Sequence, residues 1–129
     1  MSNPKTILII DDVPKNIQMA MNILKDEGYK MLFGQSGKNA LHSLENNKVD
    51  LILLDIMMPE MNGFEVCRIL KQNENYKDIP VIFLSGNDQT EDIQEAYECG
   101  GIDYILKPFL NIELITKALT YTRLSGIKF

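Results

Sequence analysis

Tryptophan is absent from this chain, histidine occurs once and cysteine twice. The histidine and the cysteines do not have the spacing of a metal site. Cys67 and Cys99 form neither a CxxC pair nor a cysteine–histidine cluster, which argues against a disulfide framework or a zinc site. Both are expected to be small buried apolar groups. His42 lies in a helix-like stretch with no second imidazole to share a metal, so a structural role is favoured over a catalytic one.

Long hydrophobic runs and an excess of positive charge are also missing. No apolar run approaches the ~20 residues that a membrane span requires, and residues 1–5 lack the apolar segment of a signal peptide. We therefore expect a cytoplasmic protein with no membrane contact. Thirteen basic against eighteen acidic residues give a net charge of -5, so direct binding of nucleic acid is not expected.

The composition of the chain is that of one folded domain. Its 129 residues are 45% hydrophobic and 24% charged, which argues against disorder and predicts a single domain over residues 1–129. Short aliphatic runs alternate with longer amphipathic ones, as in βα repeats around a parallel sheet. Five strands are predicted, at residues 6–11, 29–34, 49–55, 80–85 and 103–107.

Apolar residues recur at helical spacing between and after these strands. The last helix is predicted to bury Ile112, Ile115 and Leu119. The fourth helix, at residues 88–99, is mostly polar and should be weakly anchored. Five βα units of this size favour the flavodoxin-like fold, an α/β doubly wound sheet of order 2-1-3-4-5 with helices on both faces. Ligands bind in this fold beyond the carboxyl ends of strands one and three, which are neighbours.

Polar residues lie at or just past the carboxyl ends of four of the five predicted strands: Asp11, Asp12, Asp55, Ser85 and Lys107. Three carboxylates in one crevice repel one another, and their burial without a partner is costly, so a cation is implied. Hard oxygen ligands in a small cluster favour Mg2+, with Mn2+ as a second choice. The turn-rich loop from Met57 to Gly63 follows Asp55 and offers a carbonyl to the same cation.

The same residues suit phosphoryl transfer. Asp55 is the candidate nucleophile, because a carboxylate can attack phosphorus to give an aspartyl phosphate. The Ser85 hydroxyl and the Lys107 ammonium can each bind a phosphoryl oxygen. A cis bond between Lys107 and Pro108 is a hypothesis that would aim the lysine into the crevice.

Each of these residues also has an ordinary structural interpretation. Asp11 and Asp12 before Pro14 could be helix caps, and a strand often ends in a capping aspartate such as Asp55. The combination at the ends of neighbouring strands, with matched roles, is what favours the functional interpretation.

Nearly the whole chain, from Lys5 to about Leu124, resembles the receiver domain of bacterial two-component response regulators. The resemblance rests on Asp11-Asp12, Asp55-Ile56-Met57-Met58-Pro59 with Gly63, Ser85, and Lys107-Pro108-Phe109. It implies that a sensor histidine kinase or a histidine phosphotransfer protein phosphorylates Asp55, and that Lys107 and Ser85 contact the phosphoryl group. It also implies a Mg2+ ion held by Asp12, Asp55 and the Met57 carbonyl, with Asp11 assisting through water.

The resemblance further implies a switch in which Ser85 moves toward the phosphate and Tyr104 turns inward; a half-buried strand tyrosine is the plainer alternative. The fourth helix, last strand and fifth helix would then signal to an output domain or a protein effector. A phosphorylation-dependent homodimer is a further possibility. Such a domain assists its own phosphorylation but is not a turnover enzyme.

Three rival functions remain open on the sequence. A flavin-binding protein of the same fold would have to place a phosphate beside Asp11 and Asp12, which would repel it. A phosphatase with an aspartyl-phosphate intermediate commonly has an acid where this chain has Met57. A receiver-like module that binds partners without phosphorylation is the third.

The chain ends soon after its last predicted helix, with nothing there that resembles an effector. It therefore either acts alone on a partner or is the N-terminal receiver of a longer regulator. Residues 12–16 resemble receivers joined to signalling enzymes, which favours the second interpretation.

Overall fold

A five-stranded parallel sheet forms the centre of the molecule, and its strands lie in the order β2-β1-β3-β4-β5. The computed structural model describes residues 4–86 and 90–124. The strands are β1 (Thr6–Ile10), β2 (Lys30–Gly34), β3 (Leu51–Asp55), β4 (Val81–Ser85) and β5 (Asp103–Leu106). The helices are α1 (Pro14–Leu24), α2 (Gly37–Asn46), α3 (Gly63–Lys71), α4 (Thr90–Glu98) and α5 (Asn111–Leu124). The predicted flavodoxin-like fold and strand order are confirmed.

The three inner strands β1, β3 and β4 are buried along their whole length. Their side chains alternate between two apolar layers, because successive strand residues point to opposite faces of a sheet. In β3, for example, Leu51 and Leu53 enter one layer while Ile52 and Leu54 enter the other. Helices cover both faces, which explains why these strands are continuously apolar rather than alternating with polar residues.

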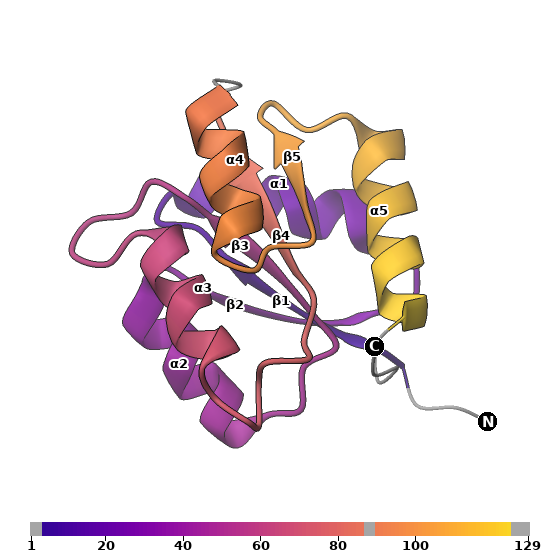
Figure 1. Ribbon diagram of the computed structural model, residues 1–129. Coiled ribbons are helices and arrows are strands. Elements are labelled where there is room, and N and C mark those ends of the chain that lie inside the picture. The colour runs from indigo at the N-terminus through magenta and orange to yellow at the C-terminus, as the bar shows by residue number, and fades with distance from the viewer. Residues whose placement is uncertain (1–3, 87–89, 125–129) are drawn as a thin grey trace.

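α1 and α5 cover one face of the sheet, and α2, α3 and α4 cover the other (Figure 1). α1 and α5 lie against each other and bury residues such as Ala20 and Ala118 on the first face. α2 and α3 lie together on the second face, which α4 completes through Ala96. No helix in the described part of the chain is long and apolar enough to cross a bilayer.

The buried stripe predicted for the last helix is wrong at two of its three residues. Ile112 is 73% exposed and Leu119 is also exposed, whereas Ile115 is half-buried and packs against the core. The fully buried residues of α5 are Leu114, Ala118 and Thr122. The helix carries apolar residues on more than one side, so periodicity alone did not identify the side that faces the sheet. Contact with α1 and β3 decides it.

The fourth helix is as sparsely anchored as its sequence predicts. Ala96 is the one buried residue in the range 92–98, and the Tyr97 side chain is exposed. The predicted start of this helix, at residues 88 and 89, lies outside the described part of the chain.

Candidate functional site

The crevice at the carboxyl ends of β1 and β3 brings together three carboxylates. Each of Asp11, Asp12 and Asp55 offers one oxygen, and these oxygens lie within 4.8 Å of one another. Asp11 and Asp55 are buried and Asp12 is half-buried. Asp55 is the last residue of β3 and Asp11 directly follows β1, so strand pairing sets the spacing of these two groups.

A lysine ammonium neutralises part of this negative charge. Lys107, which directly follows β5, places its Nζ 2.9 Å from Asp11 Oδ2 and 2.9 Å from Asp55 Oδ1. The Lys107 side chain is 19% exposed, so both ion pairs are largely shielded from water. The peptide bond between Lys107 and Pro108 is cis.

Asp11 is held in place by the start of α1. Its Oδ1 accepts a hydrogen bond from the backbone N–H of Val13 at 2.9 Å and a longer one from the Asn16 amide at 3.5 Å. Val13 is the residue that precedes the helix, and no side chain caps that end. The alternative that Asp11 and Asp12 serve as ordinary helix caps therefore finds no support in the geometry. Sequence reasoning missed Asn16, whose role depends on the turn between β1 and α1.

Burial and charge change the ionisation of the site. Burial, assisted by the charge of Asp11, raises the pKa of Asp55 to about 7, although the hydrogen bond from Lys107 opposes the shift. Burial by itself would lower the pKa of Lys107, but its contacts with Asp11 and Asp55 raise the pKa overall. Among the described residues, three carboxylates share this crevice and Lys107 is the ammonium that contacts two of them.

The donor set fits a divalent cation that prefers oxygen. Asp11 Oδ2 is buried and, within the described residues, accepts no well-directed hydrogen bond, although Lys107 faces it as an ion pair. Such an atom gains from a cation, because an unsatisfied buried acceptor is costly. Carboxylates without nitrogen or sulfur ligands suit Mg2+ rather than zinc. The acidic triad is thus able to bind a metal ion.

Comparison with known proteins assigns the family. A family model described as "Response regulator receiver domain" matches residues 7–119, which is most of the chain. The chain belongs to the response regulator receiver domain family. Its acidic pocket is the kind of site at which receivers of two-component signalling systems bind Mg2+ and accept phosphate.

Individual relatives agree with this assignment. A Vibrio cholerae protein named "Probable cyclic di-GMP phosphodiesterase" is 44% identical over 121 residues, which cover 94% of this chain and 27% of that protein. The heme response regulator HssR of Staphylococcus saprophyticus is 41% identical over 85% of this chain and 48% of its own length. The receiver thus spans less than half the length of either relative.

A solved structure matches the architecture of this receiver. The signal receiver domain of a histidine kinase from Syntrophus aciditrophicus superimposes with a TM-score of 0.87 at 31% identity. The alignment covers 97% of this chain and 95% of that one.

Ser85 and Met57 lie at or just beyond the carboxyl ends of β4 and β3, the edge of the sheet that carries this receiver's acidic pocket. Ser85 ends β4, is buried, and accepts a hydrogen bond through its carbonyl oxygen from the Lys107 N–H at 2.7 Å. The backbone of β4 therefore positions the lysine that contacts Asp55. Met57 follows Asp55 by two residues, and its side chain is 75% exposed at the surface.

The loop after Asp55 is held by the start of α3. Asn62 and Glu65 form a capping box, in which each side chain accepts a hydrogen bond from the other residue's backbone N–H. Gly63 lies so close to β3 that a Cβ there would be 2.3 Å from the Asp55 carbonyl oxygen. The sequence predicted a helix start at Gly63, but the close approach is visible only in the structure.

Tyr104 lies on β5 between the last two helices of the receiver. Its ring makes an edge contact with Tyr97 of α4, and Lys117 Nζ of α5 lies 5.5 Å from its centre. Lys117 also donates hydrogen bonds to the Tyr104 carbonyl and to Asp103, which accepts another from Tyr121. Asp103 is the first residue of β5, so the pattern of polar residues at the carboxyl ends of strands did not identify it.

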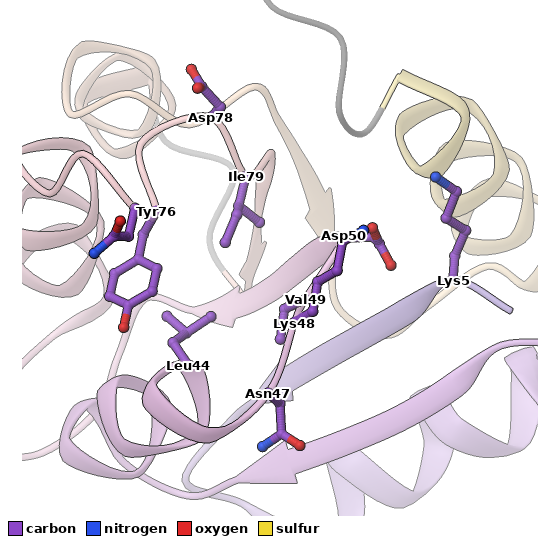
Figure 2. Close-up of a pocket in the computed structure, with 10 residues that line it drawn as sticks. Lys5, Leu44, Asn47, Lys48, Val49, Asp50, Tyr76, Asp78 and Ile79 are labelled. Carbon is purple, nitrogen blue, oxygen red and sulfur yellow. The ribbon is translucent and has the colours of Figure 1, made fainter. Parts of the chain in front are cut away.

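A second pocket lies far from the acidic cluster. Figure 2 shows it at the amino ends of the strands, where Lys5 precedes β1, Asp50 precedes β3 and Ile79 comes shortly before β4. Its volume is about 360 Å³. Because the carboxylates and Lys107 lie at the opposite edge of the sheet, this pocket takes no part in the receiver site.

Proposed function

We propose that Asp55 accepts a phosphoryl group from a sensor histidine kinase or a histidine phosphotransfer protein in a reaction that depends on Mg2+. The observation that carries this proposal is the buried contact of Lys107 with both Asp11 and Asp55 beside a third carboxylate. A lysine between two carboxylates offsets their negative charge before the reaction. After the transfer, the same ammonium can contact a negatively charged oxygen of the phosphoryl group.

The reaction forms one bond and breaks another. A carboxylate oxygen of Asp55 attacks phosphorus, the bond from phosphorus to the donor histidine nitrogen breaks, and that nitrogen keeps the electron pair. Lys107 then binds a phosphoryl oxygen, and the Ser85 hydroxyl donates to another. Asp12, Asp55 and the Met57 carbonyl would hold the Mg2+, with Asp11 assisting through water. The bound ion supplies charge neutralisation.

The surface around the site suits a protein donor. A groove of about 340 Å³ beside Lys107 is lined by Asn16 and Met19 of α1 and by Pro108 and Phe109 after β5. Met57 and Leu110 expose large apolar side chains. A helix that carries the phosphohistidine could bury the exposed side chains of Met57 and Leu110 while it presents the phosphohistidine to Asp55.

The output is proposed to leave through α4, β5 and α5. Phosphorylation would draw Ser85 toward the phosphate and Tyr104 inward, changing a face whose fourth helix is weakly anchored. One relative is named as a phosphodiesterase and another as a response regulator, and each is much longer than this chain; these relatives support an output domain or a protein effector as the partner that binds this face. We propose that residues 1–129 act as a single receiver domain that is not a turnover enzyme.

The test is the intact mass of the protein after incubation with Mg2+ and a small acyl phosphate. We expect a gain of one phosphoryl group in the native chain and in Asp26→Asn, a control that removes an exposed carboxylate elsewhere. Asp55→Asn and a chelated sample should gain none. Equal labelling of Asp55→Asn, or no labelling of the folded native chain, would refute the proposal and favour a module that binds without phosphorylation.

A further inference from the structure

Two cysteines that lie 32 residues apart in sequence meet between α3 and the end of α4. Cys67 is 0% exposed and Cys99 is 7% exposed, and both are free thiols. The Cys67 thiol donates a hydrogen bond to the Cys99 carbonyl oxygen at 3.4 Å, so the Cys67 sulfur lies against the backbone of Cys99. The sequence did not predict this proximity, because the two cysteines form no recognisable motif.

The surroundings hold the two elements together at this point. Arg68, the neighbour of Cys67 on α3, forms an ion pair with Glu95 on α4. The Cys99 thiol hydrogen-bonds to the Ala96 carbonyl at 3.3 Å, which keeps its sulfur close to the helix end. Contacts from both α3 and the end of α4 therefore hold Cys67 and Cys99 close together.

The two sulfurs differ in chemical character. The hydrogen bond from Cys67 lowers the pKa of Cys99 to about 7, whereas that same contact and burial raise the pKa of Cys67. Since the thiolate is the reactive form, Cys99 is the sulfur that reacts first with an oxidant, as the nucleophile. Cys99 is also the more exposed of the two.

We propose that Cys67 and Cys99 are a redox-active pair that closes an intramolecular disulfide on exposure to a peroxide. The Cys99 thiolate attacks one peroxide oxygen, the O–O bond breaks, and the sulfur becomes a sulfenic acid while hydroxide leaves. The Cys67 sulfur then attacks the Cys99 sulfur and displaces its oxygen as water. In total two thiols lose two hydrogens and one hydrogen peroxide becomes two waters.

The bond would tie α3 to the carboxyl end of α4. That consequence rests on the proposed function, in which α4, β5 and α5 rearrange when Asp55 is phosphorylated. A covalent tie at Cys99 restricts how far the end of α4 can move away from α3. The disulfide itself, however, forms in the unphosphorylated chain and needs neither Mg2+ nor Asp55.

The decisive experiment treats the reduced protein with a limited amount of hydrogen peroxide, blocks free thiols and maps the peptides by mass spectrometry. We expect a cross-linked pair of peptides containing Cys67 and Cys99, a loss of two hydrogens, and full reversal by a thiol reductant. Peptide mapping separates this change from oxygen added to methionines. The proposal would be overturned if the blocking reagent still labelled both cysteines after peroxide treatment. It would also be overturned if the only disulfides joined two protein molecules.

Two single variants test the order of events. Cys67→Ala should stop at a Cys99 sulfenic acid, which dimedone traps, and Cys99→Ala should leave Cys67 unmodified at the same peroxide dose. The assigned roles would be contradicted if dimedone labelled Cys67 in the Cys99→Ala variant as fast as it labels Cys99 in the Cys67→Ala variant. Neither cysteine belongs to the acidic site, so both variants should accept the phosphoryl group normally.

A final measurement separates this inference from the proposed function. Phosphorylation of Asp55 should change amide hydrogen exchange in α4 less in the oxidised protein than in the reduced protein. A cross-link without phosphoryl uptake in either form would support the disulfide and refute the proposed function. Phosphoryl uptake without any cross-link would support the proposed function and refute the disulfide.

Discussion

Three carboxylates and one ammonium share the crevice at the ends of β1 and β3, and this imbalance governs how each residue there behaves. Lys107 lies 2.9 Å from an oxygen of Asp11 and 2.9 Å from an oxygen of Asp55. A Mg2+ ion would be attracted by the surplus negative charge and repelled by the same lysine. Lysine and metal therefore compete for one set of oxygens.

Replacement of Lys107 by glutamine should reveal this competition. Without metal, the loss of the ammonium leaves two buried carboxylates unpaired, and we expect the free energy of unfolding to fall by about 3 kcal/mol. With the repulsion removed, Mg2+ should bind on the order of tenfold more tightly, which corresponds to ~1.4 kcal/mol. Urea unfolding with and without Mg2+ measures both quantities. Lys15→Gln, on the exposed surface of α1, is the control and should change neither.

The raised pKa of Asp55 predicts how stability depends on pH in the metal-free protein. The folded state keeps the Asp55 proton up to about 7, whereas the unfolded chain releases it near the ordinary value of 3.8. The unfolded chain binds fewer protons in this window, so this group's contribution to stability is complete below 3.8 and is lost as the pH rises toward 7.

Urea unfolding of chelated protein between pH 4 and pH 8 checks this sign. The native chain should lose stability relative to Asp55→Asn across the window, because asparagine has no proton to release. Parallel curves for the two proteins would show that burial does not shift the ionisation of Asp55.

At the scale of elements, the start of α3 connects a local sequence motif to the site. Asn62 and Glu65 cap the helix, and Gly63 brings it against the Asp55 backbone. An asparagine followed three residues later by glutamate is visible in the sequence, and the helix it opens was predicted. The last helix shows the opposite case: Ile112 and Leu119 have helical spacing but are exposed. Spacing identifies a helix, whereas the buried side depends on which neighbours it contacts.

Loss of the cap should cost stability without removing the acidic pocket. Asn62→Ala leaves a backbone N–H of α3 without its acceptor, and we expect a loss of ~1 kcal/mol in the free energy of unfolding. Glu65→Gln keeps a side-chain oxygen that can reach back to Asn62 and should lose much less. Thermal or urea unfolding measures the difference, and equal losses in the two variants would show that the capping box is not what stabilises this end.

At the scale of the whole molecule, two apolar layers enclose the sheet and hold the strand ends in register. The predicted central strands are buried throughout, and their alternating side chains supply both layers. The positions of Asp11, Asp55 and Lys107 follow from this register, since each lies at or just beyond the end of a strand.

Truncation of one core side chain should therefore cost far more than truncation of an exposed one of similar size. Leu53→Ala, in the middle of the buried β3, should lower the free energy of unfolding by roughly 3 kcal/mol. Ile112→Ala, on the exposed side of α5, should change it by less than about 0.5 kcal/mol. A large loss for Ile112→Ala in urea unfolding would contradict the observed orientation of α5.

Alternating aliphatic and amphipathic runs determined the order of the elements along the chain, and strand ends indicated which polar residues meet. Those features are local, because propensity and periodicity act over a few residues and parallel strands align their carboxyl ends. Three-dimensional packing alone decided the exposed side of α5, the approach of Gly63 to Asp55 and the meeting of Cys67 with Cys99. Such contacts join residues far apart in the chain, and their distances depend on how complete elements pack against one another.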